Sequence, residues 1–164
     1  LTTDRPFIPI EGSLSRRSDA RGHLDVLYEV GNLVLKRSFS RAGVFRGMHW
    51  QGPPHPQVKL IHLLRGRILD CVLDPLSPDP VLWAKELTPS SGWIRIDAHW
   101  AHGFHALEDT DFEYICHGAY REDAEVSLSI VTALRDHLGI LEPQLSAKDA
   151  AATPFPVRTV RRVD

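Results

Sequence analysis

The sequence has few of the features that mark a secreted, membrane-spanning or nucleic-acid-binding protein. It contains only two cysteines in 164 residues, and its formal net charge is −2. None of its apolar runs approaches the ~20 residues that a bilayer-spanning helix needs. Without a basic excess, neither nucleic acid nor an anionic membrane is an expected partner. No secretory signal is visible and both cysteines, Cys71 and Cys116, lie in apolar stretches, so we expect free thiols in the reducing cytoplasm.

What remains is the composition of an ordinary globular protein, with 43% hydrophobic and 24% charged residues. The length predicts a single domain over residues 1–164, large enough to bury an apolar core without disulfides. The nine histidines are many for a chain of this size and are the one compositional hint of chemistry.

Short β-rich segments separated by turn signals dominate the pattern and predict the all-β class. The spacing of these segments favours an antiparallel sandwich or barrel, and a jelly roll fits best because its interior can hold a small ligand. The segment LLRGRILD, residues 63–70, predicts a tight hairpin at Arg65-Gly66. The tail after Ala133 is less strand-like, with a helical turn expected at Ser146–Ala151. The expected strands are Leu24–Glu29, Leu33–Phe39, Val58–Leu64, Arg67–Leu73, Val81–Leu87, Trp93–Ile96, Ala101–Leu107, Phe112–His117 and Val126–Val131.

The segment FRGMHWQGPPHPQVKL, residues 45–60, places His49 between Met48 and Trp50. In a regular strand, Arg46 and His49 would point to opposite faces. A bulge at Gly47 would bring them together, and glycine permits one. From these residues alone, His49 is a metal ligand, an acid/base group or a hydrogen-bonded core histidine.

Two later segments also contain candidate groups. HWAHGFHALED, residues 99–109, has His102 and His105 three apart, which puts them on opposite strand faces, and no His-x-His pair occurs in the chain, so we expect no bound metal. In DFEYICHGAY, residues 111–120, alternation places Tyr114 on one face with Phe112 and Cys116, where it is either a core residue or a cavity residue. The Ser-x-Lys-Asp of LSAKDAA, residues 145–151, is typical of a helix start.

Together these motifs resemble those of the dTDP-4-dehydrorhamnose 3,5-epimerase family, which acts on dTDP-4-keto-6-deoxyglucose. The resemblance extends from about Ser18 to Pro154 through SDARG, FRGMHWQGPPHPQVKL, AHGF with DFEY, and LSAKDAA, in that order. It implies a cupin-type jelly roll, a nucleotide-sugar substrate, a homodimer, and no metal or organic cofactor.

The resemblance also implies roles for particular residues. His49 takes the position of the base, Asp149 that of the carboxylate orienting it, and Tyr114 that of the acid. Lys59 is the candidate for stabilising the enolate oxygen that forms when a base removes a proton beside the C4 ketone. The implied substrate-binding residues are Arg21 at the diphosphate, Arg46 in contact with the substrate, His102 around the sugar, Tyr120 near the nucleotide base, and Gln51.

Two departures from the family pattern fall around the expected sugar and nucleotide positions. Val34-Leu35-Lys36 replaces a Gln-x-Asn strand, and Asp97-Ala98-His99 stands where the family's WIPPGFAHGF segment has Pro-Pro-Gly. We therefore expect an epimerase of deoxysugar biosynthesis that inverts C3, C5 or both. The alternatives are a C3-only epimerase, a 3,4-ketoisomerase, and a cupin that binds a sugar nucleotide without turnover; the missing His-x-His disfavours a metal-dependent oxygenase.

Overall fold

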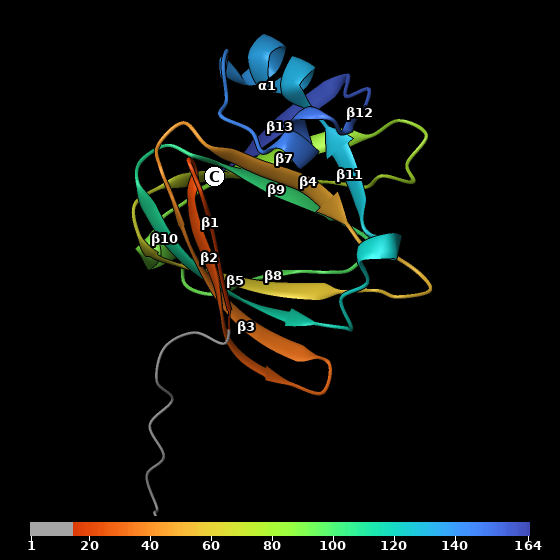
Figure 1. The fold of residues 1–164 in the computed structure, drawn as a ribbon. Coiled ribbons are helices and arrows are strands. Elements are labelled where there is room, and N and C mark those ends of the chain that lie inside the picture. Colours follow the sequence, from red (N-terminus) through yellow and green to blue (C-terminus); the bar gives the residue numbers. More distant parts are fainter. Residues whose placement is uncertain (1–14) are drawn as a thin grey trace, which may run out of the picture.

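The computed structural model describes residues 15–164, which form two β-sheets that face each other (Figure 1). Every neighbouring pair in the six-stranded sheet is antiparallel. In spatial order its strands are β1 (Ser15–Asp19), β2 (Gly22–Val30), β3 (Leu33–Ser40), β10 (Thr110–His117), β5 (Val58–Arg65) and β8 (Ile94–Ile96).

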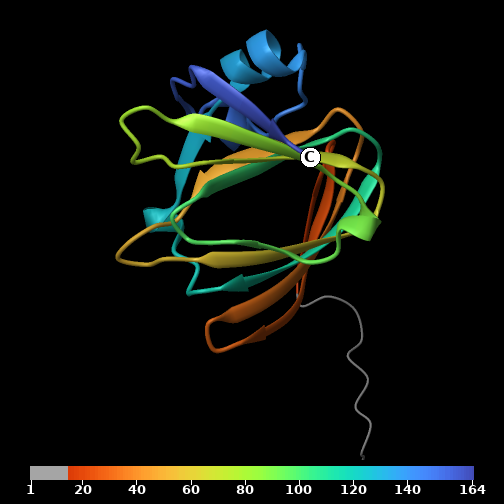
Figure 2. The same ribbon diagram turned by 180° about the vertical axis from the view of Figure 1, so that it is seen from behind.

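The seven-stranded sheet is antiparallel in its centre and parallel at its two ends, where β12 pairs with β11 and β13 pairs with β7. Its strands, in spatial order, are β12 (Thr153–Pro154), β11 (Val126–Ser129), β4 (Phe45–Trp50), β9 (Ala101–Ala106), β6 (Ile68–Leu73), β7 (Val81–Leu87) and β13 (Thr159–Val163). Two α-helices, α1 (Val131–Leu138) and α2 (Ala147–Ala150), and two 3-10 turns, η1 (Pro89–Ser91) and η2 (Glu122–Ala124), complete the described elements. Both views place α1 outside the seven-stranded layer (Figures 1 and 2). No helix within residues 15–164 is both long and apolar enough to cross a membrane.

Two apolar clusters hold these layers together. The first lies on the outer side of the seven-stranded sheet, where Met48, Leu69 and Cys71 pack with Leu134 and Leu138 of α1. The second joins the two sheets and contains Ile61, Leu63, Ile68, Leu87, Ile96, Phe104 and Phe112. Burying each large apolar side chain stabilises the fold by roughly 1.5–3 kcal/mol. Because the second cluster fills only one part of the space between the sheets, the remainder is available as a cavity.

The all-β sandwich expected from the sequence is confirmed, and β7 has the expected bounds in full. The helical turn is confirmed as α2, whose N-cap Ser146 accepts a hydrogen bond from the Asp149 backbone N–H. Both cysteines are free and buried, as expected.

The hairpin predicted at Arg65-Gly66 is wrong. Strand β5 belongs to the six-stranded sheet and β6 to the seven-stranded sheet, so the turn carries the chain from one sheet to the other. The short turn signal is the same in both cases, since Gly66 adopts a φ of +82°. What differs is the partner of each strand, because β5 pairs with β10 and β8, and β6 pairs with β9 and β7, rather than with each other.

The expected strand Val126–Val131 is too long, because it ends at Ser129 and α1 begins at Val131. Helix α1 was not predicted, nor were β1 and β13. The helix is short, and Gly139 ends it in the left-handed conformation while its N–H bonds to the Leu134 carbonyl.

Candidate active site

A cavity of about 460 Å³ lies between the two sheets. Both sheets contribute to its wall, with β1, β2, β3, β5 and β10 on one side and β4 and β9 on the other. Its polar lining is rich in cations and imidazoles and has two carboxylates: Arg17, Lys36, Arg46, Lys59, His49, His102, Glu29 and Glu125. Such a lining favours an anionic ligand.

An irregularity in β4 brings Arg46 and His49 to this cavity. The register between β4 and β9 shifts between these two residues, as expected for a bulge at Gly47. Gly47 has a φ of +116°, and a Cβ there would lie 2.6 Å from the Gly103 Cα. The bulge lets both polar side chains face the cavity while Met48 is buried in the outer core.

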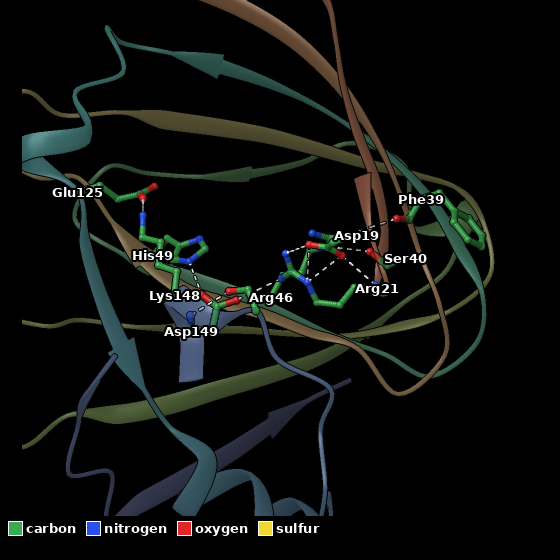
Figure 3. Close-up of polar contacts among 10 residues, drawn as sticks. Asp19, Arg21, Phe39, Ser40, Arg46, His49, Glu125, Lys148 and Asp149 are labelled. Carbon is green, nitrogen blue, oxygen red and sulfur yellow. Dashed lines mark hydrogen bonds and ion pairs between the residues drawn. The ribbon is translucent and has the colours of Figure 1, made fainter. Parts of the chain in front are cut away.

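His49 forms a close pair with Asp149 of α2 (Figure 3). The His49 Nε2 atom lies 2.7 Å from Asp149 Oδ1. An ionised carboxylate can only accept, so Nε2 holds the hydrogen and Nδ1 of the neutral ring has the free lone pair. The imidazole is 29% exposed and the carboxylate 2%. This arrangement suits a base whose inner nitrogen is fixed by a buried carboxylate.

The surroundings of Asp149 keep it ionised. Burial acts to raise the pKa of Asp149, but hydrogen bonds with His49 and Ser146 and the charge of Arg21 outweigh it and hold the pKa below its ordinary value. Arg21 Nη1 lies 3.5 Å from Asp149 Oδ2, on the side away from the imidazole. The carboxylate is therefore available to stabilise a positive charge on His49.

Tyr114 lies on the opposite wall of the cavity from His49. It belongs to β10 in the six-stranded sheet, whereas His49 belongs to β4 in the seven-stranded sheet, and both line the cavity. The alternation expected for β10 is confirmed, because Phe112 shares the cavity wall while Glu113 pairs with Arg37 and His62 on the outer face. Burial raises the pKa of Tyr114, so the phenol keeps its proton at neutral pH.

Lys59 and Arg46 place two cations beside these groups. The Lys59 Nζ lies 3.5 Å from the His49 backbone oxygen, and burial lowers the pKa of Lys59. The Arg46 Nε donates to Ser40 Oγ at 2.8 Å and its Nη2 donates to the Phe39 carbonyl at 3.3 Å. Both contacts tie Arg46, from the seven-stranded sheet, to β3 of the other sheet, as Figure 3 shows.

His102 forms a second histidine–carboxylate pair. Its Nε2 lies 2.7 Å from Asp70 Oδ1, and both side chains are less than 10% exposed. His102 also faces His49 in the β4–β9 register. Sequence reasoning missed Asp70, although a carboxylate within the apolar segment ILDCVL is a signal that could have found it, because a buried charge requires a partner.

Glu125 lies beside Tyr120, the residue expected near the nucleotide base. The Tyr120 hydroxyl lies 3.4 Å from Glu125 Oε2, and Lys148 of α2 pairs with the same carboxylate. Tyr120 and Glu125 both line the cavity. Glu125, also missed in the sequence, connects the cavity wall to the helix that holds Asp149.

Comparison with known proteins agrees with this geometry. The family model for dTDP-4-dehydrorhamnose 3,5-epimerase matches residues 19–156. A dTDP-4-dehydrorhamnose 3,5-epimerase of Streptomyces griseus is 32% identical over 162 residues, covering 93% of this chain and 80% of the relative. The chain belongs to this family. It is therefore an enzyme of the sugar-nucleotide epimerase class.

Solved structures of the family share the fold. The dTDP-4-dehydrorhamnose 3,5-epimerase of Sulfolobus tokodaii has a TM-score of 0.62 and 32% identity, covering 85% of each chain. That of Bacillus anthracis, solved with TDP and pyrophosphate bound, has a TM-score of 0.66 and 26% identity, covering 86% of this chain and 90% of the other. The dTDP-6-deoxy-D-glucose-3,5-epimerase of Legionella pneumophila, solved in complex with dTDP-4-keto-L-rhamnose, has a TM-score of 0.61 and 26% identity, covering 85% and 84%. These similarities confirm the cupin-type jelly roll.

Two residues that the resemblance assigns to substrate do not line the cavity of this epimerase. The Gln51 amide donates to the carbonyls of His55 and Ala119 and accepts from the Arg121 N–H, so its side chain joins two loops. Arg21 pairs with Asp19 and, at longer range, with Asp149, and is 13% exposed. Neither Gln51 nor Arg21 is therefore among the residues that line the cavity.

The histidines do not form a metal site in the part of the chain that the structure describes. Residues 15–164 contain no group of three or more histidine, cysteine or acidic side chains that could hold a metal ion. His102 faces the cavity, whereas His105 does not line it and pairs in register with Phe45 and Leu69. The separation of these two histidines follows from their spacing of three on a strand.

Proposed function

We propose that this enzyme inverts C3, C5 or both in a nucleotide-linked 4-keto-6-deoxyhexose, as a step of deoxysugar biosynthesis in the cytoplasm. The observation that favours this most is the placement of His49, backed by Asp149, and Tyr114 on opposite walls of one cavity. Inversion needs a base on one face of the sugar ring and an acid on the other. One histidine alone would exchange protons more readily than it would invert a centre.

The proposed reaction begins at His49. A ketone at C4 acidifies the C–H bonds at C3 and C5, and His49 Nδ1 takes one of these protons while the electron pair forms an enolate at O4. Asp149 stabilises the resulting imidazolium through Nε2. Tyr114 then donates its phenolic proton to the same carbon from the other side, and the C4 ketone is restored.

Cations in the lining match the negative charges of such a substrate. Lys59 is the candidate donor to the enolate oxygen, because it lies beside His49 and its own hydrogen bond is long. Arg46 and Arg17 suit the diphosphate, and His102 suits a sugar hydroxyl. Tyr120 offers an aromatic face for the nucleotide base.

We also propose that the enzyme is a homodimer, as the family resemblance implies. Tyr28, Leu35, Ile115 and Leu60 align in register across β2, β3, β10 and β5, and this row points away from the cavity. A second copy packed on this face would bury the row. Sedimentation velocity tests this: the parent is expected to sediment as a dimer and Ile115→Glu as a monomer, and a monomeric parent at micromolar concentration would contradict it.

Product analysis separates this function from its alternatives. The protein is incubated with dTDP-4-keto-6-deoxyglucose, the ketone is reduced with borohydride, and the configuration at C3 and C5 is read by NMR. Inversion at one or both centres supports the proposal and tells a C3-only epimerase from a 3,5-epimerase. NMR of the product before reduction shows where the ketone lies, and a ketone at C3 indicates an isomerase instead. Unchanged sugar, with binding seen by calorimetry, indicates a binding protein and contradicts the proposal.

A further inference from the structure

Lys36 is a cavity cation to which nothing above assigns a function. It lies in the middle of β3, lines the cavity, and stands directly opposite Tyr114 in the β3–β10 register. Its Nζ is 5.7 Å from the centroid of the Tyr114 ring and 5.5 Å from that of Tyr120. The ammonium group therefore sits over both tyrosine rings.

Within the described part of the chain, the Lys36 ammonium group has no carboxylate partner. No ion pair among residues 15–164 includes Lys36. Lys148, by contrast, pairs with Glu125. The charge of this half-buried lysine therefore lies over the two rings without a paired anion among residues 15–164.

Proton donation by Tyr114 creates a need for such a charge. As the phenolic O–H bond breaks and the new C–H bond forms, the electron pair of the enolate becomes that bond and Tyr114 is left as a phenolate. Burial disfavours this anion. Afterwards the phenolate takes a proton from solvent and the His49 imidazolium releases one, so the protons balance over a turnover.

The other cavity cations are less suited to this task. Arg46 acts to lower the pKa of Tyr114, but its guanidinium is also bonded to Ser40 and the Phe39 carbonyl. Lys59 is bonded to the backbone of His49, the base. Lys36 lies on the neighbouring strand to Tyr114 and contacts its ring.

We propose that Lys36 is a positioning residue that stabilises the phenolate of Tyr114 during proton delivery. This inference rests on the proposed epimerase function. It predicts that Lys36 affects the return of the proton and leaves its removal by His49 unchanged. Substrate affinity would change less than the rate of inversion.

The test compares two rates in the same sample. Parent, Lys36→Gln, Lys36→Arg and Arg17→Gln are incubated with dTDP-4-keto-6-deoxyglucose in deuterated water, and NMR follows deuterium incorporation and inversion separately. Lys36→Gln removes the charge and Lys36→Arg keeps it. Arg17→Gln is the matched control, because it removes another cavity-lining cation from β1, a strand that does not neighbour β10.

In Lys36→Gln we expect inversion to slow about tenfold or more relative to deuterium incorporation, a part of the ~10²–10⁴-fold that a general acid supplies. Lys36→Arg should restore most of the ratio. Arg17→Gln should raise KM and leave the ratio at the parent value. If Lys36→Gln only raises KM, or slows both rates equally, Lys36 acts on substrate binding or on structure and the inference is wrong. Absence of both processes in the parent would instead show that the proposed function is wrong.

Discussion

The pair formed by His49 and Asp149 is the group in this cavity that we propose removes the proton from the sugar. The carboxylate is almost wholly buried and the imidazole is not, so the pair presents one nitrogen to the cavity and keeps the other fixed. The sequence pattern singles out His49 but leaves it as a metal ligand, an acid/base group or a core histidine, and its proposed role as the base came from the family resemblance. Its partnership with Asp149, 100 residues away, followed only from the family resemblance, because local patterns say nothing about such distant contacts.

The first prediction concerns this pair. His49→Ala should abolish deuterium exchange at both carbons, because the other histidine–carboxylate pair on that wall, His102 with Asp70, is less than 10% exposed, whereas the His49 imidazole is 29% exposed. Asp149→Asn should keep the fold but no longer fix the tautomer of His49. Comparable changes in other His–Asp systems lower the reaction rate by up to ~10⁴-fold. Circular dichroism controls for folding. Near-parental exchange by His49→Ala would rule out the proposed base.

The second prediction concerns Tyr114. Tyr114→Phe retains the ring and its packing against Phe112 but removes the proton donor. Deuterium should still enter C3 or C5, because His49 does not need the phenol, whereas inverted product should fall by ~10²–10⁴-fold. NMR measures both. If this variant inverts its substrate as fast as the parent, Tyr114 is not the acid and Tyr120 or a water molecule becomes the candidate.

At the level of elements, the bulge in β4 is what places the site. Glycine in the segment Phe45–Trp50 allowed the bulge to be predicted, and the structure has it at the expected residue. The hairpin at Arg65-Gly66 was predicted wrongly for a complementary reason: a turn sequence fixes a local reversal, but only long-range pairing decides which sheet each strand joins. Helix α1 is short, and its N-cap residue Ile130 makes no capping hydrogen bond with its side chain. Its sequence therefore carries few of the signals that predict a helix.

The third prediction tests the close approach of β4 and β9. A Cβ on Gly103 would lie 2.7 Å from the Arg46 carbonyl oxygen and 2.9 Å from Met48 Sδ. Gly103→Ala should therefore destabilise the protein by about 1–3 kcal/mol, as overpacking usually does, and slow the reaction by displacing His49. Urea denaturation measures the stability.

Gly31→Ala provides the control for this prediction. Gly31 has a positive φ but nothing within 4 Å of an added Cβ, so its substitution strains the backbone without crowding. Its stability should fall by about 1–2 kcal/mol while the reaction rate stays at the parent value. If Gly103→Ala is as stable and as active as the parent, the two strands do not constrain the site.

For the whole molecule, the jelly roll converts residues scattered along the chain into one cavity wall. Arg46, His49, Lys59 and Tyr114 were expected together and do line one cavity. Gln51 was expected there and instead joins two loops, which no local pattern distinguishes from a cavity position. Strand order and sheet curvature decide which side chains line the cavity, and both are properties of the complete fold.

The fourth prediction is that activity does not depend on a metal ion. The cavity histidines each pair with a carboxylate and are not grouped with further ligands within residues 15–164. The reaction rate should therefore be unchanged after prolonged dialysis against EDTA. Loss of activity on chelation, restored by a single divalent ion, would contradict this.

In the proposed reaction, a C–H bond beside a ketone is broken in this cavity and re-formed from the opposite side of the sugar ring. The most direct measurement is to incubate the parent protein with dTDP-4-keto-6-deoxyglucose in deuterated water and to follow C3 and C5 by NMR. Deuterium should enter at least one of these carbons, and the labelled centre should appear in the inverted configuration. Recovery of the sugar without deuterium and with its original configuration, from a correctly folded protein, would contradict the proposed reaction.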